Sequence, residues 1–66
     1  VRFGAVGMAD ILGMLPPLGT LLAVEVKSAT GRLRPAQRAF LDTVNAAGGR
    51  AFVARAVADV QRELGL

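Results

Sequence analysis

Two charged residues, Glu25 and Lys27, close an otherwise apolar segment of the sequence at a spacing of two. Alternate residues of a β-strand share a face and lie roughly 6 to 7 Å apart, so both side chains would point the same way. Asp10 opens another apolar segment that could pair beside this one. Two carboxylates on neighbouring strands, with the carbonyl oxygen of Val26 between them, would offer oxygen ligands to Mg²⁺. A metal there could polarise a phosphoryl oxygen, with Lys27 holding water or neutralising negative charge.

Each of these residues also has an ordinary structural explanation. Glu25 and Lys27 could mark a strand that leaves the core for solvent, where charge costs little. Asp10 could be a turn residue or the start of a strand. The three residues together favour the metal-dependent chemistry over these separate explanations.

Gln37 is the one polar residue on the apolar face of a predicted helix, in its first turn. That turn follows the loop leaving Lys27, so its amide could reach the Glu25 end of the sheet and bind phosphate or a water at the metal. A core-facing amide needs hydrogen-bond partners. The alternative is a residue at the rim of the helix start that bonds to the backbone.

Arg32, Arg34 and Arg38 extend a basic stretch that begins at Lys27 and contains no acid. Such a stretch attracts phosphate backbones, but taken alone it is more often a solvated surface. For Arg38, an exposed i, i+4 pair with Asp42 is the simpler explanation. Three further arginines are interpreted as solubility charges: Arg50, Arg55 and Arg62.

Composition limits the remaining chemistry. A chain of 66 residues is one domain of marginal stability. It has no Cys and no His, which excludes disulfides, zinc fingers and Cys or His catalysis, and leaves oxygen ligands for a metal such as Mg²⁺ or Mn²⁺. No Tyr or Trp is present, which argues against a base-stacking platform. The uncharged stretch from Ile11 to Val24 is too short and too interrupted by Pro and Gly to span a membrane.

The elements that would position these residues follow from periodicity and turn signals. Val1 to Gly4 and Asp10 to Leu15 are expected as short strands, and a proline-containing turn ends at Gly19. Thr20 to Lys27 is the clearest strand.

A helix is expected from Pro35 to Ala47, because proline suits a first helical position and Gly48-Gly49 a stop. Ala51 to Ala54 would be a strand and Ala56 to Leu64 a helix. We therefore expect an α/β protein with a mixed central sheet in the order β-β-β-α-β-α, one face covered by the first helix and the other largely uncovered.

The stretch Leu22–Arg38, LAVEVKSATGRLRPAQR, resembles the VRR-NUC (virus-type replication–repair nuclease) branch of the PD-(D/E)XK nucleases. It contains the E-V-K strand, then S-A-T-G-R-L, then a glutamine that opens a helix. Gly7 to Asp10 is similar to the G-x-x-D motif before the first metal ligand, with Ala9 in place of the usual proline. The resemblance runs from about Gly4 to Leu64.

This resemblance implies a restriction-endonuclease-like core and an endodeoxyribonuclease that depends on Mg²⁺ or Mn²⁺. Asp10, Glu25 and the Val26 carbonyl would bind metal, Lys27 would be the catalytic lysine, and Gln37 would support it. It further implies a homodimer that acts on DNA, including branched DNA, in the cytoplasm of a bacterial or phage-infected cell. The family's N-terminal helix is missing, so residues 1–66 are expected to be one trimmed or minimal core.

Two other functions remain open on the residues. One is a nuclease-like fold that binds nucleic acid without cleaving it. The other is a small α/β interaction domain with incidental charges, which would show no salt-dependent affinity for DNA.

Overall fold

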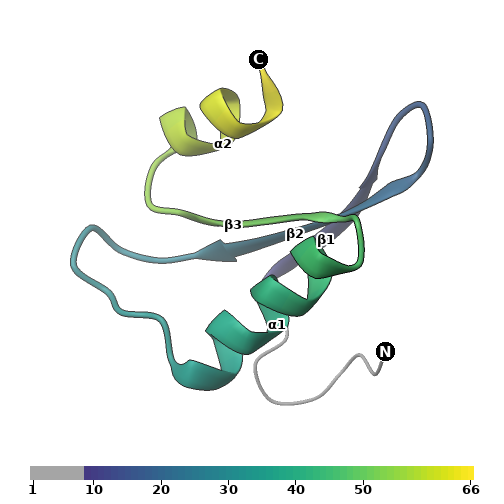
Figure 1. Cartoon of the computed structure of the whole chain (residues 1–66). Helices are drawn as coiled ribbons and strands as arrows, with labels where there is room; N and C mark the ends of the chain where they lie inside the picture. The colour runs from purple at the N-terminus through teal and green to yellow at the C-terminus, as the bar shows by residue number, and fades with distance from the viewer. Residues whose placement is uncertain (1–8) are drawn as a thin grey trace.

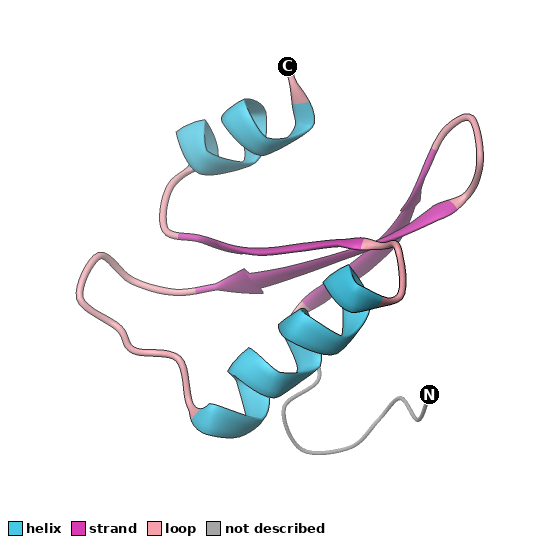
Figure 2. Ribbon diagram, in the orientation of Figure 1, coloured by secondary structure: helices cyan, strands magenta, loops and turns pink. Residues whose placement is uncertain are grey.

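The computed structural model describes residues 9–66 as a three-stranded sheet with two helices (Figures 1 and 2). The α/β class is confirmed, and the boundaries of the five described elements each lie within one residue of their predicted positions. The predicted strand Val1 to Gly4 lies outside the described residues, whose order is β-β-α-β-α. The elements are β1 (Ile11–Leu15), β2 (Thr20–Val26), α1 (Pro35–Ala46), β3 (Arg50–Ala54) and α2 (Val57–Leu64).

The sheet has the order β1-β2-β3 and is mixed, as the sequence predicts. β1 and β2 form an antiparallel hairpin, in which the N–H of Gly19 donates to the carbonyl of Leu15 at 2.9 Å. β2 and β3 are parallel, with Val26 opposite Ala54, and α1 crosses between them. This topology brings the carboxyl ends of β2 and β3 together at one end of the sheet.

Helix α1 covers the face of the sheet to which Ala23 and Glu25 point. Leu41 and Val44 of the helix pack there on Ala23, and all three side chains are buried. The close approach depends on Gly49, since a Cβ at that position would lie 2.9 Å from the carbonyl oxygen of Leu21. Gly49, between the end of the helix and the start of β3, therefore permits this packing.

Helix α2 lies on the opposite face, where it packs along β3 (Figure 1). Arg50 at the start of β3 donates to the carbonyl of Glu63 near the end of α2. The sequence-based expectation that this face is largely uncovered is therefore wrong at β3. It holds at β1, where Ile11, paired with Val24 on that face, is 50% exposed.

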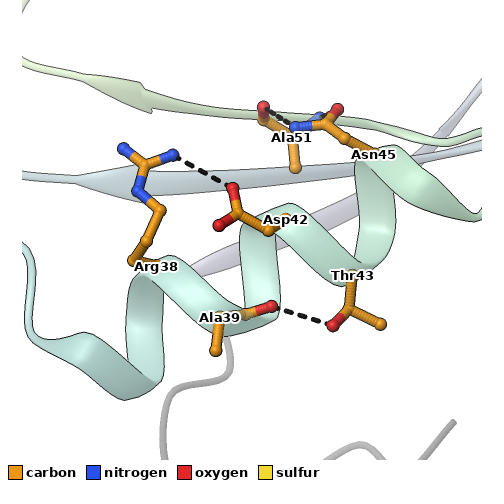
Figure 3. A network of polar contacts seen from close by, with 6 residues as sticks. All are labelled: Arg38, Ala39, Asp42, Thr43, Asn45 and Ala51. Carbon is orange, nitrogen blue, oxygen red and sulfur yellow. Dashed lines mark hydrogen bonds and ion pairs between the residues drawn. The ribbon is translucent and has the colours of Figure 1, made fainter.

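The free edge of β3 is partly closed by the side chain of Asn45 from α1 (Figure 3). Its amide accepts a hydrogen bond from the N–H of Ala51 and donates to the carbonyl of the same residue, both at 2.9 Å. Periodicity places Asn45 on the solvent face of the helix, and it is exposed. The bidentate contact nevertheless ties the helix end to an edge strand whose polar groups would otherwise face water.

Neither described helix is long and apolar enough to cross a membrane.

Candidate metal and phosphate site

Asp10 and Glu25 come together at the end of the sheet where β1 begins. Because Ile11 pairs with Val24, the residue before Ile11 lies opposite Glu25 in the hairpin. The Oδ2 atom of Asp10 accepts a hydrogen bond from the backbone N–H of Val26 at 3.0 Å. The structure thus brings together the two carboxylates that the sequence analysis singled out, with Val26 between them.

Glu25 is a carboxyl group in the core. Its residue is only 2% exposed, and its Oε1 atom has no hydrogen-bond partner among the described residues. A buried, unpaired carboxylate oxygen is costly, and native proteins retain one chiefly where a ligand or ion satisfies it. The burial of Glu25 therefore does not fit the alternative of a strand running out into solvent, and its unpaired oxygen is free to accept from a ligand.

The two carboxyl groups perturb each other in opposite directions. Burial raises the pKa of Glu25, and the hydrogen bond and charge of Asp10 raise it further. The pKa of Asp10 is lowered, first by the hydrogen bond to Glu25 and then by the N–H of Val26. The pair therefore loses its protons in two coupled steps, the first at a lower pH and the second at a higher pH than isolated carboxyl groups.

This coupling predicts a pH dependence of folding stability in the metal-free protein. The stabilising contribution of Glu25 is fully present below its ordinary pKa of 4.5 and is lost as pH rises through its raised folded pKa. The thermal midpoint in EDTA is therefore expected to fall over that range in wild type but not in Glu25→Gln, and Mn²⁺ is expected to restore it. Melting curves from pH 4 to 8 test this, and parallel curves for the two proteins would contradict it.

Lys27 follows β2 directly and is half-buried. Its backbone N–H donates to the carbonyl of Ala54 at 3.0 Å, which continues the parallel pairing by one step. Strand alternation places its side chain on the face of Glu25. Its positive charge acts to lower the pKa of both Asp10 and Glu25, so the ammonium lies within electrostatic reach of the pair.

Gln37 is engaged at the start of α1. Its Oε1 atom accepts a hydrogen bond from the backbone N–H of Arg34 at 2.9 Å, which caps the helix. This is the rim role that the sequence analysis held as the alternative. No hydrogen bond joins Gln37 to Asp10 or Glu25 within residues 9–66, and its amide nitrogen faces no described acceptor.

The three candidate DNA-binding arginines are all exposed near the start of α1. Arg38 forms the expected surface pair with Asp42 at 3.4 Å, with side chains 56% and 63% exposed (Figure 3). In the described part of the chain, Arg32 and Arg34 form no ion pair. These two positive charges are therefore uncompensated beside the loop that leaves Lys27.

Arg55 is a residue near the site whose role the sequence analysis missed. Its guanidinium donates to the carbonyls of Ser28 and Gly31 in the loop after Lys27. Its position directly after β3 could have predicted this contact, because the parallel register of β2 and β3 sets Arg55 beside Lys27. Arg55 is therefore more than the solubility charge that the sequence analysis expected.

These oxygen donors suit a hard cation that takes only a few of its ligands from the protein. Asp10 and Glu25 supply carboxylate oxygens beside the Val26 backbone, the donor type that Mg²⁺ prefers. Residues 9–66 hold no group of three or more Asp, Glu, His or Cys side chains placed to bind a metal. An ion here would keep several waters, as Mg²⁺ commonly does.

In this small α/β fold, two carboxylates and a lysine lie at the ends of adjacent strands, near two exposed arginines that form no ion pair within residues 9–66. A family model described as the VRR-NUC domain matches residues 1–58. The chain belongs to this nuclease family, which confirms the resemblance seen in the sequence and makes DNA the expected substrate. Comparisons with curated proteins and with solved structures gave no match.

Proposed function

We propose that this chain is an endodeoxyribonuclease that requires Mg²⁺ or Mn²⁺. The observation that carries the proposal is the buried Glu25, whose Oε1 atom is unpaired beside the carboxylate of Asp10. These two residues, with the Val26 carbonyl, would hold the ion. When bound, the ion would polarise the scissile phosphate and make water a stronger nucleophile.

The residues around Asp10 and Glu25 would supply the remaining catalytic and DNA-binding contacts. Lys27, on the same face as Glu25, would orient the attacking water or neutralise negative charge that develops on the phosphate. The amide nitrogen of Gln37 is left to support this group while its oxygen caps α1. Arg32, Arg34 and Arg38 would bind the DNA backbone on either side of the cut.

We further propose that the enzyme acts as a homodimer on branched DNA, such as a four-way junction or a flap, in the cytoplasm of a bacterial or phage-infected cell. The support for a partner copy is the apolar exposure of β1, where Leu12 is 40% and Met14 76% exposed. Two-fold related sites would suit the paired strands of a junction.

The alternative function is a nuclease-like module that binds DNA without cutting it. It is favoured by one observation, the lack of a third acidic side chain beside Asp10 and Glu25 within residues 9–66. A single pair of carboxylates could bind an ion too weakly for turnover.

The test is cleavage of labelled four-way-junction, flap and plain duplex DNA with Mg²⁺, Mn²⁺ or EDTA. We expect cutting with either metal, none with EDTA, and a preference for branched substrates. Salt-dependent DNA binding without cutting in any metal would establish the alternative function instead. Equal cutting of all three substrates would refute the structure selectivity alone.

A further inference from the structure

Arg55 joins the end of β3 to the loop that follows Lys27. Its Nη1 atom donates to the carbonyl oxygen of Ser28 at 2.7 Å and to that of Gly31 at 2.5 Å. Its own backbone N–H donates to Oδ2 of Asp59 at 2.8 Å. Arg55 therefore joins two segments, because its guanidinium binds the loop after Lys27 while its backbone is held by the first turn of α2.

The segment that Arg55 binds is a compact turn from Ser28 to Gly31. The N–H of Gly31 donates to the Ser28 hydroxyl at 3.0 Å and to its carbonyl at 3.3 Å. A Cβ at Gly31 would lie 3.0 Å from Oγ of Ser28 and 3.6 Å from Cβ of Lys27, so the turn is folded back on Lys27. The carbonyl oxygens of Ser28 and Gly31 both accept from Arg55 as well.

The 28–31 turn lies between two residues of the candidate site. Lys27 precedes the turn directly, and Arg32 follows it directly. Regular β2 pairing ends at the bond between Lys27 N–H and the Ala54 carbonyl, and α1 begins only at Pro35. Between these points no strand or helix fixes the backbone. Leu33 packs against the core and the Gln37 side chain bonds the N–H of Arg34, but the 28–31 turn receives its side-chain hydrogen bonds from outside, among the described residues, only from Arg55 (the left side of Figure 1).

We propose that Arg55 is a positioning residue, which holds the 28–31 turn so that Lys27 and Arg32 face the same phosphate. The proposal rests on the proposed nuclease function and extends it to a residue outside the metal pair. The guanidinium pairs with no described carboxylate, so its charge also adds to the positive potential at this end of the sheet. Arg55 would act through Lys27 and not by touching the reacting atoms.

The test compares Arg55→Gln with Arg50→Gln. Arg50 is a matched control, because it also lies on the β3 side, donates to a backbone carbonyl and carries one positive charge, but it does so at the other end of the strand. We expect Arg55→Gln to speed amide exchange in residues 28–34 and to lower kcat about ten- to a hundredfold, the usual cost of losing a supporting contact. Arg50→Gln should do neither, and Mn²⁺ affinity should be unchanged in both.

A double-mutant cycle with Lys27→Met separates positioning from an independent role. If Arg55 acts through Lys27, Arg55→Gln should cost little more in the Lys27→Met background. The same loss in both backgrounds would overturn the proposal and indicate direct contact with DNA. The kcat of Arg55→Lys, which keeps the charge and one donor, should fall between those of wild type and Arg55→Gln. This variant replaces Arg55→Gln in the test if the glutamine variant unfolds.

The outcomes also separate this proposal from the proposed function. A wild-type protein that cuts no DNA with any metal refutes the nuclease function. A wild-type protein that cuts, with an Arg55→Gln variant that cuts equally well and exchanges residues 28–34 no faster, refutes only the role of Arg55.

Discussion

Replacing Glu25 by glutamine is expected to abolish measurable cleavage while leaving the fold intact. The change removes one of two carboxylates from the proposed metal pair and keeps the size of the side chain. Metal ions stabilise such transition states by several kcal/mol, so kcat should fall on the order of a thousandfold or more. The metal-free variant should be at least as stable as wild type near pH 7, because it no longer places an ionisable carboxyl in the buried position beside Asp10, where the pKa of Glu25 is raised.

Opposite changes in activity and stability distinguish a ligand from a structural residue, since loss of a structural contact lowers both. The matched control is Glu63→Gln, which makes the same chemical change at an exposed carboxylate 3.4 Å from Arg50. It should leave kcat and Mn²⁺ affinity unaltered. Cleavage rates, Mn²⁺ titrations and melting curves measure the three quantities. A fully active Glu25→Gln variant would exclude Glu25 as a metal ligand.

The carboxylate pair could be predicted from the sequence because short-range patterns determine it. Alternation along β2 places Glu25 on the face of Ala23, and both are buried, at 2% and 0% exposure. A hairpin between two adjacent apolar segments then brings Asp10 beside Glu25. Both steps need only a period of two and a turn signal.

The contacts that the sequence did not predict depend on register and on side-chain rotamers. Arg55 reaches Ser28 across 27 residues, and only the parallel pairing of β2 with β3 makes them neighbours. For Gln37, helical periodicity gives the face of the helix but not the rotamer, which turns its oxygen back to the N–H of Arg34. Asn45 lies on the solvent face as expected, but its bond to Ala51 depends on how far α1 extends beside β3.

Replacing Lys27 by methionine is expected to lower kcat about a hundred- to a thousandfold, the cost of removing one charged donor from a transition state. Methionine keeps a flexible apolar stem but has no ammonium. Mn²⁺ affinity should not weaken, because the change removes a positive charge from the neighbourhood of Asp10 and Glu25. Loss of turnover with retained metal binding would therefore distinguish Lys27 from the two carboxylates.

Arg38→Met is the matched control for charge, because Arg38 lies nearby on the surface and its ion pair within residues 9–66 is with Asp42 at 3.4 Å. It should weaken DNA binding slightly and reduce its salt dependence, with kcat nearly unchanged. Rates at saturating DNA, measured beside Mn²⁺ titrations, separate the two variants. If Lys27→Met lost only DNA affinity, as Arg38→Met should, Lys27 would be a phosphate contact and the pair of carboxylates would act without a catalytic lysine.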